Sequence, residues 1–242
     1  MNEEIWITRL FNDHLASIGN VALNLVGWPS APRPWTNYVC MELLVAAIIV
    51  VVFALLKSRL SVEKPSNFQQ TFELMQEFVH SQGEEQIEHH SEKYIAFFGA
   101  LFVFILFSNL IGVIPGFESP TKYPAVPLGL AVAAFLYYNV IGISTIGPVS
   151  YAKHFAGPLW WLAPLMIPIE IISHFARPLS LTVRLFANMY AGEQITMVFL
   201  GLTYFAVPAV FMGLHVFVSL IQAYVFMVLA MLYVGAAVAH EH

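Results

Sequence analysis

The chain has 242 residues, of which 59% are hydrophobic and only 10% are charged. Soluble domains carry about 25% charged residues, so this composition excludes a protein built mainly for water and indicates a membrane protein with several spans. The net charge of −5 gives no reason to expect a nucleic-acid partner, and we expect none. The single cysteine, Cys40, excludes an intramolecular disulfide and a cysteine-based metal site, and we interpret it as a small buried side chain in an apolar run.

Residues 1–38 form an N-terminal segment that we expect to be amphipathic and interfacial. Over residues 3–25, apolar side chains recur at helical spacing with charged residues between them, which predicts one amphipathic helix in the membrane interface. Charges also stand where a signal peptide would have its apolar core, so we expect no signal peptide. The connector that follows contains Trp28 and Trp35 among several prolines. The prolines end the helix, and the tryptophans favour the headgroup level of the membrane.

The first transmembrane helix is predicted over residues 39–57, because residues 43–56 form an apolar run without a charge. Lys57, Arg59 and Lys64 follow it directly. Positive residues gather on the cytoplasmic side of membrane proteins, so this pattern predicts that the N-terminus lies outside the cell.

A polar cytoplasmic segment is predicted over residues 58–93. One apolar stripe runs along it, which favours a helix that lies in the interface or faces a partner. His80, His89 and His90, with glutamates nearby, resemble a metal cluster by composition only. We interpret them as part of a solvated charged face, and we expect neither a metal nor a cofactor.

Residues 94–242 form the last division of the chain. Two spans are predicted, at Tyr94–Ile114 and near residues 126–146, joined by a proline-rich outer loop. Two further apolar stretches, at about 159–200 and 204–239, are each nearly twice the length needed to cross, which predicts a long, steeply tilted helical hairpin. The expected fold class is therefore all-α: a polytopic membrane protein with about five transmembrane helices, an N-terminal amphipathic helix and a cytoplasmic C-terminus.

Nearly all the intramembrane polarity lies in this hairpin. At about 100° per residue, Asn188 falls one turn beyond Arg184 on nearly the same face, whereas Glu193 faces the opposite side. Paired against each other, the two stretches would bring His215 to Glu193 and Gln222 to Arg184. Carboxylates, imidazole and amides in series are the material of a proton or ion pathway. The polar side chains of the hairpin include Glu170, Ser173, His174, Arg177, Arg184, Asn188, Glu193, His215, Ser219, Gln222 and Tyr233.

Arg184 is the costliest of these residues. A charge at mid-bilayer depth costs at least about 2.5 kcal/mol and is treated as functional by default. About sixteen residues of mostly apolar helix lie beyond Arg184, which is a long way to water. Three neighbours have plainer interpretations: Arg177 can snorkel beside Pro178, His174 can be a hydrogen-bonded packing residue, and Tyr233 can be an interfacial aromatic.

Three motifs resemble the subunit a family of the rotary F-type ATP synthases. They occupy residues 178–193, 220–233 and 109–116. The first two are long, ordered and specific, with the arginine in place. The resemblance covers about residues 90–240 and extends to the remaining residues in layout only.

The resemblance implies a stator half of a proton channel in the cell (inner) membrane, packed against a ring of c subunits that each carry one carboxylate, with peripheral-stalk b subunits as further partners. It implies that Arg184 is the essential arginine, which couples proton flow through two half-channels to c-ring rotation. Ala187 stands where many relatives have glycine, and Arg177 stands where some have lysine. Neither departure touches this mechanism. Nothing resembles a P-loop, so we expect no catalysis by this chain itself. The half-channel residues that we expect are Glu170 on the inner side and His174, Asn188, Glu193, His215, Ser219, Gln222 and Tyr233.

Two other classes of protein are kept as alternatives. A secondary transporter could use a membrane arginine to bind an anionic solute, and it predicts a discontinuous helix and repeat symmetry. A membrane-arm subunit of a redox complex would call for haem-ligand histidine pairs, for which His174 and His215 are the candidates.

Overall fold

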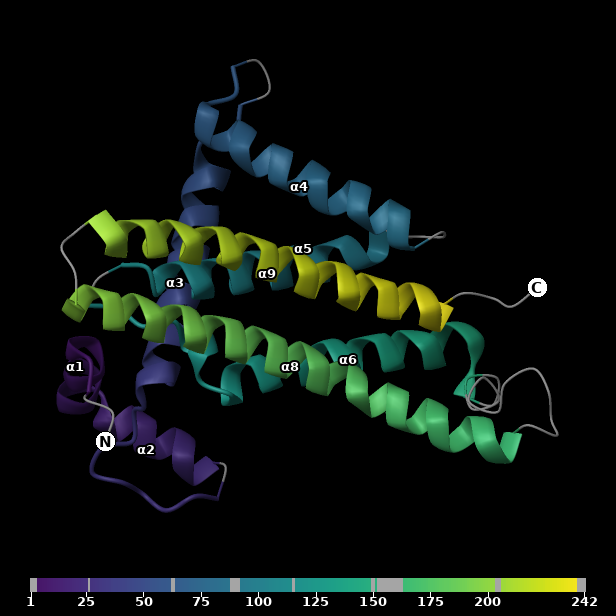
Figure 1. The fold of residues 1–242 in the computed structure, drawn as a ribbon, viewed down its shortest axis with the longest axis horizontal. Coiled ribbons are helices and arrows are strands. Elements are labelled where there is room, and N and C mark those ends of the chain that lie inside the picture. The colour runs from purple at the N-terminus through teal and green to yellow at the C-terminus, as the bar shows by residue number, and fades with distance from the viewer. Residues whose placement is uncertain are drawn as a thin grey trace.

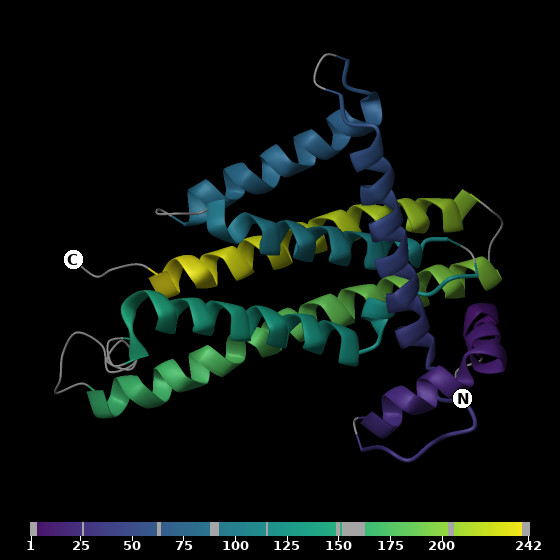
Figure 2. The ribbon, with the colours of Figure 1, turned by 180° about the vertical axis from the view of Figure 1, so that it is seen from behind.

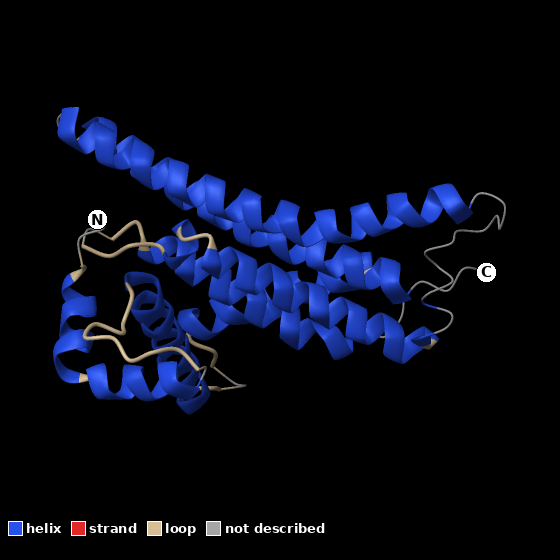
Figure 3. Cartoon of the chain, turned by 90° about the horizontal axis from the view of Figure 1, so that it is seen from below, coloured by secondary structure: helices blue, strands red, loops and turns tan. Residues whose placement is uncertain are grey.

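The computed structural model contains only helices, turns and loops in the residues that it describes, which confirms the expected all-α class (Figure 3). Four long helices, α5, α6, α8 and α9, run alongside one another, and α3 crosses them (Figures 1 and 2). The N-terminal helices lie at one end of α3 and α4 lies at the other. The described residues are 4–25, 27–61, 64–87, 92–114, 116–148, 151, 163–202 and 206–238.

The N-terminal segment contains two helices, α1 (Trp6–His14) and α2 (Ala16–Leu25). The prediction of one continuous helix over residues 3–25 is therefore wrong. The break falls at Leu15, whose carbonyl accepts a hydrogen bond from Trp35 Nε1 at 2.8 Å. Asn12 and the Trp35 backbone exchange two more hydrogen bonds, of 3.0 and 3.1 Å. The connector thus folds back onto the helix and fixes a bend that local propensity does not encode.

Helix α3 (Asn37–Ser58) confirms the first predicted span, with bounds within two residues of those expected. Helix α4 (Asn67–Gln86) follows, and the side chain of Ser66 caps it by accepting a hydrogen bond from the Gln69 backbone N–H. Its apolar stripe packs on α5 and α9. The polar segment therefore forms a helix that lies against the bundle.

Helices α5 (Glu92–Ile111) and α6 (Ala125–Ile146) confirm the next two spans. Helix α5 ends three residues before the predicted Ile114, because the chain turns at Gly112 to pack against Ser119. The connecting loop contains the 3₁₀ turn η1 (Pro120–Lys122).

The predicted hairpin is present as α8 (Ala163–Leu202) and α9 (Ala206–Val238). With 40 residues, α8 is about 60 Å long, twice a hydrocarbon core of about 30 Å. Among the described helices, α3, α5, α6 and α9 are long and apolar enough to cross a membrane. Helix α8 carries more charge than such a span normally does, which makes its polar side chains the centre of interest.

The largest hydrophobic core lies where α5, α6, α8 and α9 meet. Leu185 and Met189 of α8 and Phe226 and Met227 of α9 have no exposed surface. In lipid, such helices associate by close packing and hydrogen bonding. The faces on which α8 and α9 meet are consequently closely packed.

Candidate functional site

Asn188 and Gln222 join the two helices of the hairpin near its middle. Asn188 Nδ2 donates a hydrogen bond of 2.8 Å to Gln222 Oε1. Gln222 therefore meets Asn188, and the expected pairing of Gln222 with Arg184 is wrong. A guanidinium N–H could donate to the same oxygen, so the register of the two helices, and not donor chemistry, selects Asn188.

Arg184 lies half-buried on α8, one turn before Asn188. The described part of the chain gives it neither a hydrogen bond nor an ion pair. Val183 and Ala187 beside it are exposed and apolar. The guanidinium is thus presented at the edge of an apolar helix face with no carboxylate of the described chain to neutralise it.

Glu193 lies towards the C-terminal end of α8, and its partner is a residue that the sequence pattern did not single out. Lys122 Nζ of η1 lies 2.7 Å from Glu193 Oε1 and 3.1 Å from Glu118 Oε2. The Tyr123 hydroxyl donates to the same Glu118 oxygen at 2.7 Å. Burial, and next the hydrogen bond to Glu118, raise the pKa of Tyr123 above its ordinary value, so this phenol stays protonated. Arg184 and Glu193 do not pair, as their opposite faces predicted.

His215 packs against the backbone of Gly192. Its Nδ1 lies only 3.0 Å from the place where a Cβ at residue 192 would be, so the glycine makes room for the ring. His215 thus comes next to Glu193 along α8, as expected, but in the described part of the chain the two side chains share no hydrogen bond, since Glu193 Oε1 binds Lys122 and Glu193 Oε2 has no partner there. Glu193 Oε2, His215 Nε2 and Gln222 Nε2 are all buried without a hydrogen-bond partner in the described residues. Buried polar atoms are normally satisfied, so this run of three is suited to water or to a moving proton.

Ser219 is fully buried on the same stripe of α9, one turn from His215. Its hydroxyl points to the sulfur of Met189 at 4.0 Å, a weak contact.

We use the name Glu193 cluster for Glu118, Lys122, Tyr123, Glu193 and His215.

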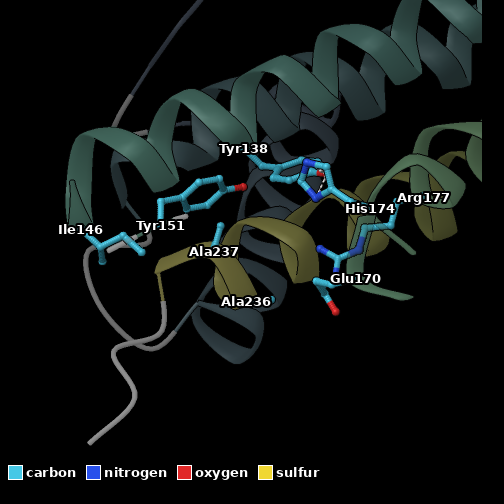
Figure 4. Close-up of a pocket in the computed structure, with 8 residues that line it drawn as sticks. All are labelled: Tyr138, Ile146, Tyr151, Glu170, His174, Arg177, Ala236 and Ala237. Carbon is cyan, nitrogen blue, oxygen red and sulfur yellow. Dashed lines mark hydrogen bonds and ion pairs between the residues drawn. The ribbon is translucent and has the colours of Figure 1, made fainter. Parts of the chain in front are cut away.

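The other end of α8 lines a cavity of about 30 Å³, room for about two water molecules (Figure 4). Glu170 Oε1 and Arg177 Nη2 lie 3.7 Å apart in its wall. His174 lies 3.2 Å from the Tyr138 hydroxyl and 3.0 Å from Asn139 Oδ1. We call this cavity the Glu170 cleft. Its lining residues are Tyr138, Ile146, Tyr151, Glu170, His174, Arg177, Ala236 and Ala237.

Tyr233 lies at the edge of this cleft. The Arg177 guanidinium stacks over its ring at 5.1 Å, a cation–π contact. Arg177 is thus held by Tyr233 and Glu170 and does not simply extend to the interface. His174 has the hydrogen bonds of a packing residue, and Tyr138 and Asn139, its partners, carry no sequence signal beyond their place in a predicted span.

The remaining candidates from the sequence are the histidines His80, His89 and His90. His80 lies 3.5 Å from Glu84 on α4, an ion pair only when the histidine is protonated. His89 and His90 lie outside the described residues. The ranges that are described contain no group of three or more metal-binding side chains. Helices α8 and α9 each run unbroken through the polar residues, so the discontinuous helix of the transporter alternative is not found there.

Several long apolar helices and a hairpin with charged groups along its length define a multi-pass membrane protein with ionisable residues inside its helical bundle. Comparison with known proteins narrows this class. A family model described as ATP synthase A chain matches residues 39–235. The chain belongs to this family.

Three relatives, each named ATP synthase subunit a, illustrate the similarity. The protein of Solibacter usitatus is 64% identical over 233 residues, which cover 96% of this chain and 100% of the relative. That of Koribacter versatilis is 47% identical over 244 residues, covering both chains completely. That of Trichlorobacter lovleyi is 38% identical over 229 residues, covering 95% of this chain and 93% of the relative. The resemblance seen in the three motifs is confirmed.

Proposed function

We propose that this membrane subunit of an ATP synthase provides two aqueous half-channels to the carboxylates of a c-ring and couples proton flow to rotation through Arg184. The observation that carries the proposal is the position of Arg184 on α8. It lies without a counter-charge in the described chain, between the Glu193 cluster towards one end of the helix and the Glu170 cleft towards the other. An unpaired membrane arginine marks a pathway or the site of a charged partner.

Protons enter at the Glu193 cluster and pass along the buried polar atoms of Glu193, His215 and Gln222. There they neutralise a c-ring carboxylate, which can then turn into lipid, where its charged form would be costly. After nearly a full turn the carboxylate meets the Glu170 cleft and releases its proton. The membrane potential supplies about 2.3 kcal/mol per charge per 100 mV, which biases the direction.

Arg184 separates the two half-channels. Its positive charge favours the ionised form of an arriving carboxylate and so promotes proton loss. The same charge repels a proton that would pass directly from one half-channel to the other. Asn188, one turn away on nearly the same face, is bonded to Gln222 and so ties this part of α8 to α9 beside the arginine.

Lys57, Arg59 and Lys64 after α3 support an orientation with that end in the cytoplasm, by the positive-inside rule. The N-terminus and the Glu193 cluster are then outside, and the Glu170 cleft and the C-terminus are inside. The c-ring is the partner that faces Arg184, and peripheral-stalk b subunits hold this stator in the cell (inner) membrane.

The test replaces Arg184 in the complete enzyme. Arg184→Ala should abolish proton-driven ATP synthesis while the subunit still co-purifies with the ring of c subunits. The matched control is Arg59→Ala, at the exposed end of α3, which should keep normal synthesis. Normal coupled synthesis in Arg184→Ala would refute the proposed function.

A further inference from the structure

Lys122 lies in the loop between α5 and α6, yet its side chain is only 13% exposed. It is shared by two carboxylates, Glu193 with 10% of its side chain exposed and Glu118 with 24%. Lysine is almost never this deeply buried unless it is paired. The loop therefore delivers a cation into the bundle, onto the acidic residue of α8.

The turn that carries Lys122 is held firmly. The Ser119 hydroxyl donates to the Ser108 carbonyl at 2.9 Å, and the Thr121 hydroxyl donates to Asn109 Oδ1 at 2.6 Å. Ser108 and Asn109 belong to the buried end of α5. Gly112 permits the approach, because a Cβ there would lie 2.8 Å from Ser119 Cβ. The position of Lys122 is consequently set by a spanning helix.

We infer that Lys122 is a positioning residue for proton uptake: a tethered cation, shared between Glu118 and Glu193, that keeps Glu193 ionised and leaves its Oε2 free to accept a proton. The inference rests on the proposed function, since it gives a role in the same half-channel. The proton that arrives from water binds Glu193 Oε2 and is passed on, so no charge is gained or lost by the lysine.

The charges around Glu193 support a role in proton uptake. A buried carboxylate without a cation prefers its neutral form, and a neutral acid cannot accept another proton. Helix α9 contributes His215, and the loop contributes Glu118, Tyr123 and Lys122. Tyr123 stays neutral, so Lys122 is the permanent cation of the Glu193 cluster.

The second carboxylate explains how the ammonium can release Glu193. When Glu193 takes up a proton, Lys122 remains paired with Glu118, 3.1 Å away, and no buried charge is left alone. When Glu193 passes the proton inward, Lys122 binds it again. A single lysine–glutamate pair would resist protonation of Glu193 more strongly than this shared arrangement.

The experiment measures ATP synthesis by the whole enzyme in proteoliposomes, with the pH varied only on the side of the membrane that Lys122 faces. Lys122→Gln should move the pH of half-maximal synthesis upwards by about one unit, because Glu193 then holds protons more tightly. Lys122→Arg should keep the native midpoint. Lys57→Gln, the same change at the exposed end of α3, is the matched control and should also keep it.

Glu118→Gln is an independent test, in which the midpoint should shift in the opposite direction. It leaves Lys122 to Glu193 alone, so the midpoint should move to lower pH. This variant retains the cation and tests the inference even when Lys122→Gln does not assemble. A native midpoint in both Lys122→Gln and Glu118→Gln, or equal shifts in Lys122→Gln and Lys122→Arg, would overturn it.

The two proposals fail differently. Full synthesis by Arg184→Ala would refute the proposed function. Loss of synthesis in Arg184→Ala, together with an unmoved midpoint in the Lys122 and Glu118 variants, would refute only the role of Lys122.

Discussion

The two ends of α8 carry the same kinds of group in different settings. Each has a carboxylate, a cation and a histidine: Glu193 with Lys122 and His215 at one end, and Glu170, Arg177 and His174 at the other. The first ion pair is 2.7 Å long, with side chains 10% and 13% exposed. The second is 3.7 Å long, with side chains 31% and 27% exposed, and it borders a cavity.

The comparison shows that burial decides what the same residue types can do. Exposed ion pairs contribute about 0–1 kcal/mol, because water and salt screen them. Breaking a buried pair costs several times as much, since one charge is left without water or a partner. The pair in the Glu193 cluster is therefore shielded from solvent, whereas the pair that borders the Glu170 cleft is open to screening by water and salt.

The largest effect is expected from the glycine under His215. Gly192→Val should lower ATP-driven proton pumping at least about tenfold, because the added side chain pushes the His215 ring from its place, and a misplacement of about 1 Å can cost about 100-fold in rate. Pumping is measured with a pH-sensitive dye in vesicles of the complete enzyme. Gly201→Val is the matched control on α8, since a Cβ there meets nothing within 4 Å. Equal losses in both variants would show that the packing of His215 is not what matters.

A smaller effect separates the two ion pairs. Lys122→Met should lower the free energy of unfolding by about 2 kcal/mol, because it strands the buried Glu193, whereas Arg177→Met should cost less than about 1 kcal/mol. Added salt should weaken the contribution of Arg177 and leave that of Lys122 nearly unchanged. Denaturant unfolding of the purified protein in detergent measures both. Equal losses would contradict the difference in burial.

The smallest effect concerns the two tyrosines beside these clusters. Burial raises the pKa of both Tyr123 and Tyr151, but Glu118 raises that of Tyr123 further, whereas Arg177 lowers that of Tyr151. Each raised pKa means that folding favours the neutral phenol, so this stabilisation is full below about pH 10 and is lost as the pH rises through the folded-state pKa. The Tyr123 phenol should therefore titrate at a higher pH than the Tyr151 phenol. In a tyrosinate absorbance titration, the step that Tyr151→Phe removes should lie at a lower pH than the step that Tyr123→Phe removes. The reverse order would contradict the assignment of charges.

The hairpin and the spans could be predicted from the sequence because length and apolarity alone decide whether a segment fits a bilayer. The faces of Arg184, Asn188 and Glu193 followed from helical periodicity. Their partners did not, since periodicity fixes the angle of a side chain and leaves open how far two helices slide. One turn of sliding, about 5.4 Å, separates Gln222 against Asn188 from Gln222 against Arg184.

The Lys122–Glu193 pair lay beyond sequence reasoning for another reason. The two residues are 71 positions apart, and their contact depends on a loop fold that rests on buried hydrogen bonds to α5. The break at Leu15 is similar, because a tryptophan twenty residues later sets it. A lysine in the outer loop was the available signal for the first, and nothing local signalled the second.

The close approach of α4 to α9 affects the direction in which the polar side chains of α9 point. A Cβ at Gly235 would overlap the Gln86 carbonyl, and the Tyr224 hydroxyl donates to Gln82 Oε1 at 3.0 Å. Helix α9 therefore cannot turn about its own axis without driving a side chain into the backbone at the end of α4. The two contacts lock its rotational register, and the one at Gly235 does so far along the helix from His215. The direction in which His215 and Gln222 point is in this way held by contacts of α9 with α4.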